Sequence, residues 1–128
     1  MKLLLDTRAF IWWDSEPAKL SSLVLGLCQD NQNTLLLSVA SIWEMQIKSQ
    51  LGKLSIKLPL ADLIESQRQT NNLQILPVLL EHVLALQHLP LHHKDPFDRL
   101  LIAQSKTHDA VLISHDTAFS QYSVKMLW

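Results

Sequence analysis

Short apolar runs that alternate with longer helical segments constrain the fold of this chain more than any other feature. The runs are LLL at 3–5, TLLLS at 34–38, LQIL at 73–76 and AVLIS at 110–114, with a weaker one, SVKMLW, at 123–128. Apolar runs of this length, bounded by polar residues, are typical of strands that are buried on both faces. Strands that alternate with helices predict an α/β fold with a parallel sheet of four to five strands, flanked by helices on both faces.

The segments between these runs carry the helical signals. Helices are predicted over residues 7–13, about 20–30, 39–52, 60–69, 79–88 and 96–107. Gly52 ends the third of them, since glycine is favoured just after a helix. Only Gly26 and Gly52 are glycines, which excludes a glycine-rich loop that cradles phosphates.

The composition bounds the class of protein. A chain of 128 residues suits a single domain, expected here over 1–128, and 48% hydrophobic residues suffice for a core. The formal net charge is −1, so a site for a polyanion is expected to be local or assisted by a metal ion. The single cysteine, Cys28, fits a reducing compartment, and Asp6 interrupts the first apolar run before a secretory signal is complete. We therefore expect a small soluble protein of the cytoplasm.

Acidic residues follow two of the predicted strands. Asp6 comes directly after the first apolar run, and Asp116 lies just beyond the fourth, in LISHDTAF. Each could simply cap a following helix, since aspartate is a favoured N-cap residue. The carboxyl ends of parallel strands meet at one edge of the sheet, where α/β proteins bind their ligands. Two acids at that edge favour a functional site.

Glu44 is a third candidate, on the helix that follows the second strand. In SIWEMQIK it falls at the border of the buried face, so its carboxylate is predicted to face the sheet edge. The alternative is a surface ion pair with Lys48, four residues on.

Asp98 is the fourth candidate, and it lies three residues after another aspartate. Asp95 directly precedes Pro96, which suits the first position of a helix, so Asp95 is the natural N-cap. Asp98 has Leu101 and Ile102 one turn on, which predicts that its side chain faces the sheet. A carboxylate between apolar neighbours needs a partner, and a metal ion is an adequate one.

This set of acids selects hard cations. Mg²⁺ or Mn²⁺ takes a few carboxylate oxygens, keeps waters and phosphate oxygens, and activates a water for attack on a phosphodiester. His88, His92 and His93 lack the spacing of a zinc site, so the carboxylates are expected to act without histidine support. The candidate contacts for substrate phosphates are Arg8, Lys48, Lys94 and Arg99.

Four blocks of the sequence resemble, in order and spacing, the PIN-domain ribonuclease family. They are LLLDTRAFIWW, SVASIWEMQIKSQLGKL, LPLHHKDPFDRLLIAQ and LISHDTAFSQY, and the likeness, closest to the VapC-type toxins of bacterial toxin–antitoxin systems, covers essentially the whole chain. The resemblance implies a PIN-like fold, an endoribonuclease that depends on Mg²⁺ or Mn²⁺, homodimerisation, and inhibition by a small antitoxin. It places the catalytic and metal-binding acids at Asp6, Glu44, Asp98 and Asp116, with Asp95 as a substitute or supplementary ligand.

The match departs from the family pattern at two positions. Arg8 stands where many relatives have histidine, and Ser114 stands two residues before the last acid, where threonine is frequent. Neither change removes an acid, but the blocks do not specify the exact substrate.

Three alternatives stay open at this point. The first is a PIN-fold nuclease that acts on DNA or on structured nucleic acid. The second is a receiver-like signalling module, which would need an acidic pair near the first strand and a phosphoacceptor on a middle strand, whereas this chain has Asp6 alone. The third is a non-catalytic protein-binding module, and the retention of all four acids argues against it.

Three tryptophans near the predicted first and third helices bear on the partners of the protein. One interpretation is that all three side chains are buried in the core, and these are Trp12, Trp13 and Trp43. Any of them that is exposed is a candidate anchor for an antitoxin segment or a second subunit.

Overall fold

Five parallel strands form the centre of the computed structural model, which describes residues 1–128. The strands are β1 (Lys2–Leu5), β2 (Thr34–Ser38), β3 (Gln74–Leu76), β4 (Val111–Ile113) and β5 (Met126–Leu127). They lie in the order β3-β2-β1-β4-β5, and each neighbouring pair is parallel. The predicted parallel sheet is confirmed, with five strands.

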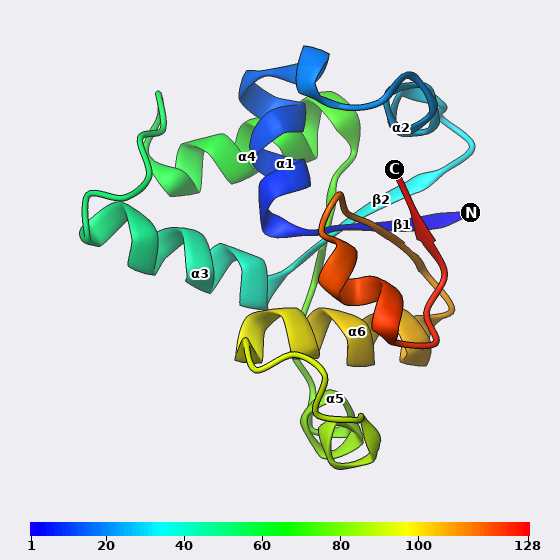
Figure 1. The fold of residues 1–128 in the computed structure, drawn as a ribbon. Helices are drawn as coiled ribbons and strands as arrows, with labels where there is room; N and C mark the ends of the chain where they lie inside the picture. The colour runs from blue at the N-terminus through cyan, green and yellow to red at the C-terminus, as the bar shows by residue number, and fades with distance from the viewer.

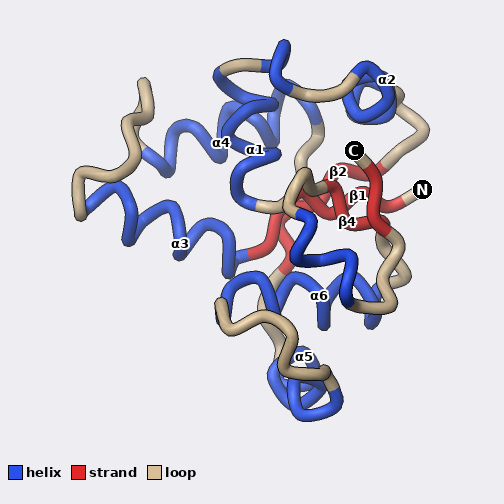
Figure 2. The backbone as a smooth tube through the Cα atoms, in the orientation of Figure 1, coloured by secondary structure: helices blue, strands red, loops and turns tan.

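Six α-helices surround the sheet. They are α1 (Thr7–Ser15), α2 (Ser22–Gln29), α3 (Val39–Gln50), α4 (Leu60–Asn71), α5 (Leu80–Ala85) and α6 (Pro96–His108). Short 3-10 segments span Pro17–Lys19, Leu86–His88 and Thr117–Gln121. Figure 1 shows α1, α2 and α4 on one side of the strands and α5 and α6 on the other, whereas α3 runs outward from the end of β2. Figure 2 shows the same three layers, with the strands in the middle.

The leucines of β1 explain why an uninterrupted apolar run is needed in such a sheet. Leu3 and Leu5 pack in a cluster that includes Phe10 of α1, whereas Leu4 packs in a second cluster that includes Ile102 of α6. Consecutive residues of a strand point to opposite faces, and both faces of this sheet are covered. Every position of the strand therefore has to be apolar.

The strand order creates a switch point beside β1. From β1 the chain moves outward through β2 to β3, and it then crosses to the other side of β1 to add β4 and β5. In open α/β sheets, ligands bind outside the carboxyl ends of the strands at such a point. Asp6 and Asp116 follow the two strands that flank it, β1 and β4.

The predicted elements differ from the observed ones mainly at their ends. The helix expected over 79–88 is α-helical only to Ala85 and then tightens into a 3-10 turn. The strand expected over 123–128 has two paired residues, Met126 and Leu127, because it is an edge strand that pairs with the short β4 alone. None of the helices combines the length and the apolar character that crossing a membrane requires.

Candidate metal and phosphate site

A cavity of about 750 Å³ opens at the carboxyl ends of β1 and β4. The acids that line it are Asp6, Glu44, Asp95, Asp98 and Asp116. They come from five places in the chain: the turn after β1, helix α3, the N-cap and the first turn of α6, and the segment after β4. The fold therefore brings every acid predicted from the sequence into one cavity.

Asp6 is both a helix cap and a wall of the cavity. Its Oδ1 atom accepts a hydrogen bond of 2.7 Å from the backbone N–H of Ala9, so the capping role is confirmed. Asp6 is buried, and burial raises the pKa of its carboxyl group, against the hydrogen bonds from Ser114 and Ala9. The negative charge of Asp116, which lines the same cavity, adds to this rise.

Glu44 faces the cavity and also makes the ion pair that was its alternative role. Its Oε1 atom accepts a hydrogen bond from the hydroxyl group of Thr7, a buried residue next to Asp6. Its Oε2 atom lies 3.1 Å from Lys48 Nζ. Thr7 thus ties helix α3 to the start of α1 and holds the Glu44 carboxylate beside Asp6.

Asp95 and Asp98 lie in two different environments, as their spacing predicted. Asp95 Oδ1 accepts hydrogen bonds from the backbone N–H groups of Phe97 and Asp98, at 2.8 and 3.1 Å, which confirms it as the N-cap of α6. The Asp98 side chain lies one turn further on and faces the cavity, with 20% of its surface exposed.

Asp95→Ala is expected to lower stability and to leave the cavity largely intact. The variant loses the side-chain acceptor of two backbone N–H groups, which costs about 1 kcal/mol. Urea unfolding of the variant and the parent protein measures the difference. Asp95→Asn keeps the acceptor and serves as the matched control, because asparagine is an equally good N-cap. A loss for Asp95→Asn as large as that for alanine would contradict the capping role.

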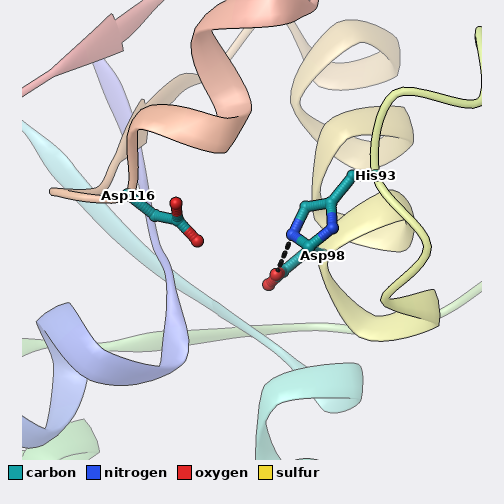
Figure 3. Close-up of side chains that lie close together, drawn as sticks. All are labelled: His93, Asp98 and Asp116. Atoms are coloured by element: carbon teal, nitrogen blue, oxygen red, sulfur yellow. Dashed lines mark hydrogen bonds and ion pairs between the residues drawn. The ribbon is translucent and has the colours of Figure 1, made fainter.

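His93 lies among the acids, which was not predicted. Its Nε2 atom is 2.7 Å from Asp98 Oδ2. Single ligand atoms of His93, Asp98 and Asp116 all lie within 4.8 Å of one another. In Figure 3, Asp116 points toward the other two side chains from the segment that follows β4. The expectation that the carboxylates act without histidine is therefore wrong, since an imidazole is in hydrogen-bond contact with one of them.

The acid–base equilibrium of Asp98 is also strongly perturbed. The pKa of its carboxyl group is raised to about 7, chiefly by burial and in addition by the negative charges of Asp95 and Glu44, against the contact with His93, which lowers it. A carboxylate in such surroundings lacks compensating positive charge. A bound cation would supply that charge.

The metal-free protein is expected to lose stability as the pH rises from about 4 to about 7. The folded state holds a proton on Asp98 up to a pKa of about 7, whereas an unfolded aspartate releases it near 3.8. The stabilisation from this proton is therefore complete below the unfolded value, and it is lost as the pH rises through the folded value. Melting temperatures in EDTA across this range test the prediction. Asp98→Asn has no such proton and should show a flatter profile, and identical profiles would contradict the assignment.

The predicted phosphate contacts divide into two groups. Arg8 and Lys48 line the cavity, and Lys53, which was not predicted, lines it with them. Lys94 and Arg99 are not part of the lining. The Arg99 guanidinium group donates hydrogen bonds to the carbonyl oxygens of Pro90 and Leu86, so it holds the loop before α6 instead of facing the cavity.

An aromatic wall closes one side of the cavity and was also not predicted. Trp128 and Trp12 line it with ring centroids 5.6 Å apart, and the imidazole of His115 stacks on Trp128 at 5.1 Å. No signal in the sequence pointed to Trp128, because its place depends on the pairing of β5 with β4. His93 had a signal, since HHKD directly precedes the helix that carries Asp98.

The donor set fits a hard divalent cation. Carboxylate oxygens predominate, the imidazole of His93 is already hydrogen-bonded to a carboxylate, and the only cysteine, Cys28, is not part of the lining. Mg²⁺ and Mn²⁺ prefer such oxygen donors. Asp6, Asp98 and Asp116, with Glu44 close by, are the residues that could hold the ion, while Arg8, Lys48 and Lys53 could contact an anionic ligand.

We compared the chain with models of protein families, with curated sequences and with solved structures. Residues 3–125 match the family model described as the PIN domain. No curated protein is significantly similar to the chain in sequence. Three similar solved structures are VapBC2 from Rickettsia felis bound to a promoter DNA fragment (TM-score 0.74, 16% identity), DNA-bound VapBC from Salmonella typhimurium (0.71, 10%) and VapBC-1 from nontypeable Haemophilus influenzae (0.66, 19%). Each alignment covers 99% of this chain, and the alignments cover 98%, 97% and 97% of the other chains. At these identities the likeness concerns the fold.

Proposed function

The chain belongs to the PIN-domain family, and on that premise we propose that it is a cytoplasmic endoribonuclease that depends on Mg²⁺ or Mn²⁺ and acts as the toxin of a type II toxin–antitoxin pair. One observation carries this proposal. The acids Asp6, Glu44, Asp98 and Asp116 come from four separate segments and line one cavity at the switch point of the sheet. A structural role for each acid alone would not require them to meet.

The acids of the cavity have separate parts in the proposed hydrolysis. Asp6, Asp98 and Asp116 would hold the cation, and Glu44, fixed by Thr7, would complete the acidic rim. A bound Mg²⁺ or Mn²⁺ would supply an activated water and would stabilise the negative charge that develops on the phosphate.

The basic residues of the cavity support the binding of a polyanion. Arg8, Lys48 and Lys53 contact the phosphates on either side of the bond that is cut. The net charge of −1 gives the protein as a whole no attraction for nucleic acid, so these local charges and the cation provide it.

Incubation of the purified protein with single-stranded RNA and with DNA of the same sequence tests the proposed activity. We expect internal cleavage of RNA in Mn²⁺, no cleavage in EDTA, and intact DNA in both. Cleavage of DNA in place of RNA would favour the runner-up, a PIN-fold nuclease for DNA. Absence of cleavage of either would favour a protein-binding module that keeps the fold without the chemistry.

Trp43 is the best candidate among the three tryptophans for contact with the antitoxin. It is 60% exposed and lies edge-on to Phe97 of α6, with ring centroids 5.2 Å apart, whereas Trp12 and Trp13 are half-buried. The similar structures named above are of VapBC toxin–antitoxin proteins, which supports a partner of this kind. The homodimer that the family resemblance implies is part of the same proposal, and light scattering of the purified protein measures it.

Trp43→Ala is expected to weaken antitoxin binding by about 30-fold, the effect of losing an aromatic anchor worth about 2 kcal/mol. The melting temperature should change little, because most of the side chain is exposed. Calorimetric titration with the antitoxin measures the affinity. Leu51→Ala, at an apolar residue of similar exposure just beyond α3, is the control. Equal affinities of Trp43→Ala and the parent protein would exclude Trp43 as an anchor.

A further inference from the structure

The backbone of His93 is held by a buried tyrosine from the far end of the chain. The N–H group of His93 donates a hydrogen bond of 2.8 Å to Tyr122 Oη, and the Tyr122 hydroxyl donates to the carbonyl oxygen of Pro90 at 3.0 Å. Arg99 Nη1 lies 3.3 Å from the same Tyr122 oxygen. The loop that carries His93 is thus fixed to the core, and the position of its imidazole is set before any ligand binds.

The hydrogen bonds of the imidazole define which nitrogen carries its proton. The backbone N–H of Asp95 points at Nδ1 from 3.5 Å, so Nδ1 is the acceptor of the ring. The proton of the neutral ring then lies on Nε2, which faces Asp98 Oδ2 at 2.7 Å. Asp98 Oδ1 receives no hydrogen bond and remains available to another ligand.

We propose that His93 is a positioning residue that holds the Asp98 carboxylate in its metal-binding orientation by donating Nε2–H to Oδ2. The inference rests on the proposed function, because that proposal makes Asp98 a ligand of the cation. Hydrogen-bond partners of metal ligands fix the orientation of the ligand, and their loss typically weakens metal binding by about 10-fold to 100-fold.

Direct ligation by His93 is the competing possibility, and the tautomer argues against it. A neutral imidazole that binds a cation through Nε2 carries its proton on Nδ1. That proton would face the N–H group of Asp95, and two donors would then oppose each other. The proximity of His93 to Asp98 and Asp116 is therefore better explained by donation to a ligand than by ligation.

The test measures Mn²⁺ affinity from the electron paramagnetic resonance signal of free Mn²⁺, without any nuclease assay. His93→Ala is expected to bind Mn²⁺ about 10-fold to 100-fold more weakly than the parent protein. His93→Gln should recover part of the loss, because its amide group offers an N–H donor. His92→Ala is the matched control, since His92 is the exposed neighbour outside the cavity lining, and it should keep the parental affinity. Melting temperatures in EDTA confirm that each variant is folded.

Three results would overturn the inference: parental Mn²⁺ affinity in folded His93→Ala, no Mn²⁺ binding by the parent protein, or a directly bound nitrogen detected on Mn²⁺ by electron spin echo spectroscopy. The last result would make His93 a ligand. Failure of the proposed function is distinguishable from these results. A parent protein that binds Mn²⁺ through a His93-dependent site and cuts no RNA would refute the ribonuclease while the positioning role stands.

Discussion

Replacement of Asp98 by asparagine is expected to reduce RNA cleavage by more than about 100-fold. Loss of a residue that only hydrogen-bonds to a metal ligand typically costs up to about 100-fold, and loss of the proposed ligand itself should cost more. The change keeps the size and shape of the side chain and removes its negative charge. Asparagine also relieves the repulsion from Asp95 and Glu44 that raises the pKa of Asp98, so the folded state should not be destabilised. Initial rates of RNA cleavage in Mn²⁺, together with melting temperatures in EDTA, separate the two effects.

Asp109→Asn is the matched control for this experiment. Asp109 lies at the other end of the same helix, its side chain is 85% exposed, and asparagine tolerates the left-handed backbone conformation found there. We expect its cleavage rate to equal that of the parent protein. If Asp95→Ala abolished cleavage and Asp98→Asn only changed stability, the assignment of cap and ligand would be reversed.

Mn²⁺ is expected to raise the melting temperature of the parent protein by on the order of 10 °C when present at about 100 times its dissociation constant. An ion that binds only the folded state stabilises it, by about 2.7 kcal/mol at this saturation. The same ion should restore the cleavage that EDTA removes. Differential scanning calorimetry with and without Mn²⁺ gives the shift.

Asp6→Asn should remove most of this shift and reduce cleavage to the EDTA level. Asparagine retains an oxygen that can accept the hydrogen bond from Ala9, so α1 keeps its cap and the fold is expected to persist. Asp30→Asn, at a surface acid after α2, is the control and should respond to Mn²⁺ like the parent protein. An undiminished Mn²⁺ shift in folded Asp6→Asn would place the cation elsewhere.

Much of the fold could be predicted from the sequence, because the burial of an element determines which of its residues are apolar. Strands covered on both faces need apolar residues at every position, which made β1, β2 and β4 visible as uninterrupted runs. The cap of α6 was also predictable, because Asp95 and Pro96 act through contacts within one turn. The ends of α5 and β5 were less accurately predicted, since they depend on which neighbours those elements reach.

The acids of the site were predictable for a similar reason, and their neighbours were not. Asp6 and Asp98 take their directions from the strand or helix that carries them. His93 lies in a loop, and its position depends on a hydrogen bond to Tyr122, 29 residues further along the chain. Arg99 faces away from the cavity because backbone carbonyl groups of a neighbouring loop accept its hydrogen bonds. Contacts of this long-range kind leave no periodic pattern.

The central position of β1 determines when the acidic cavity can form during synthesis. β1 leaves the ribosome before the other four strands of the sheet, but its pairing with β4 joins Leu3 to Val111, which is made after β2 and β3. Asp98 and Asp116 likewise become available only after β1, β2 and β3 have been made. A nascent or truncated chain that lacks β4 can form the β1–β2 pair and still has no complete set of acids. The site therefore assembles when β4 pairs with β1. This pairing joins residues that are far apart in the sequence, and such pairing is slow in parallel sheets.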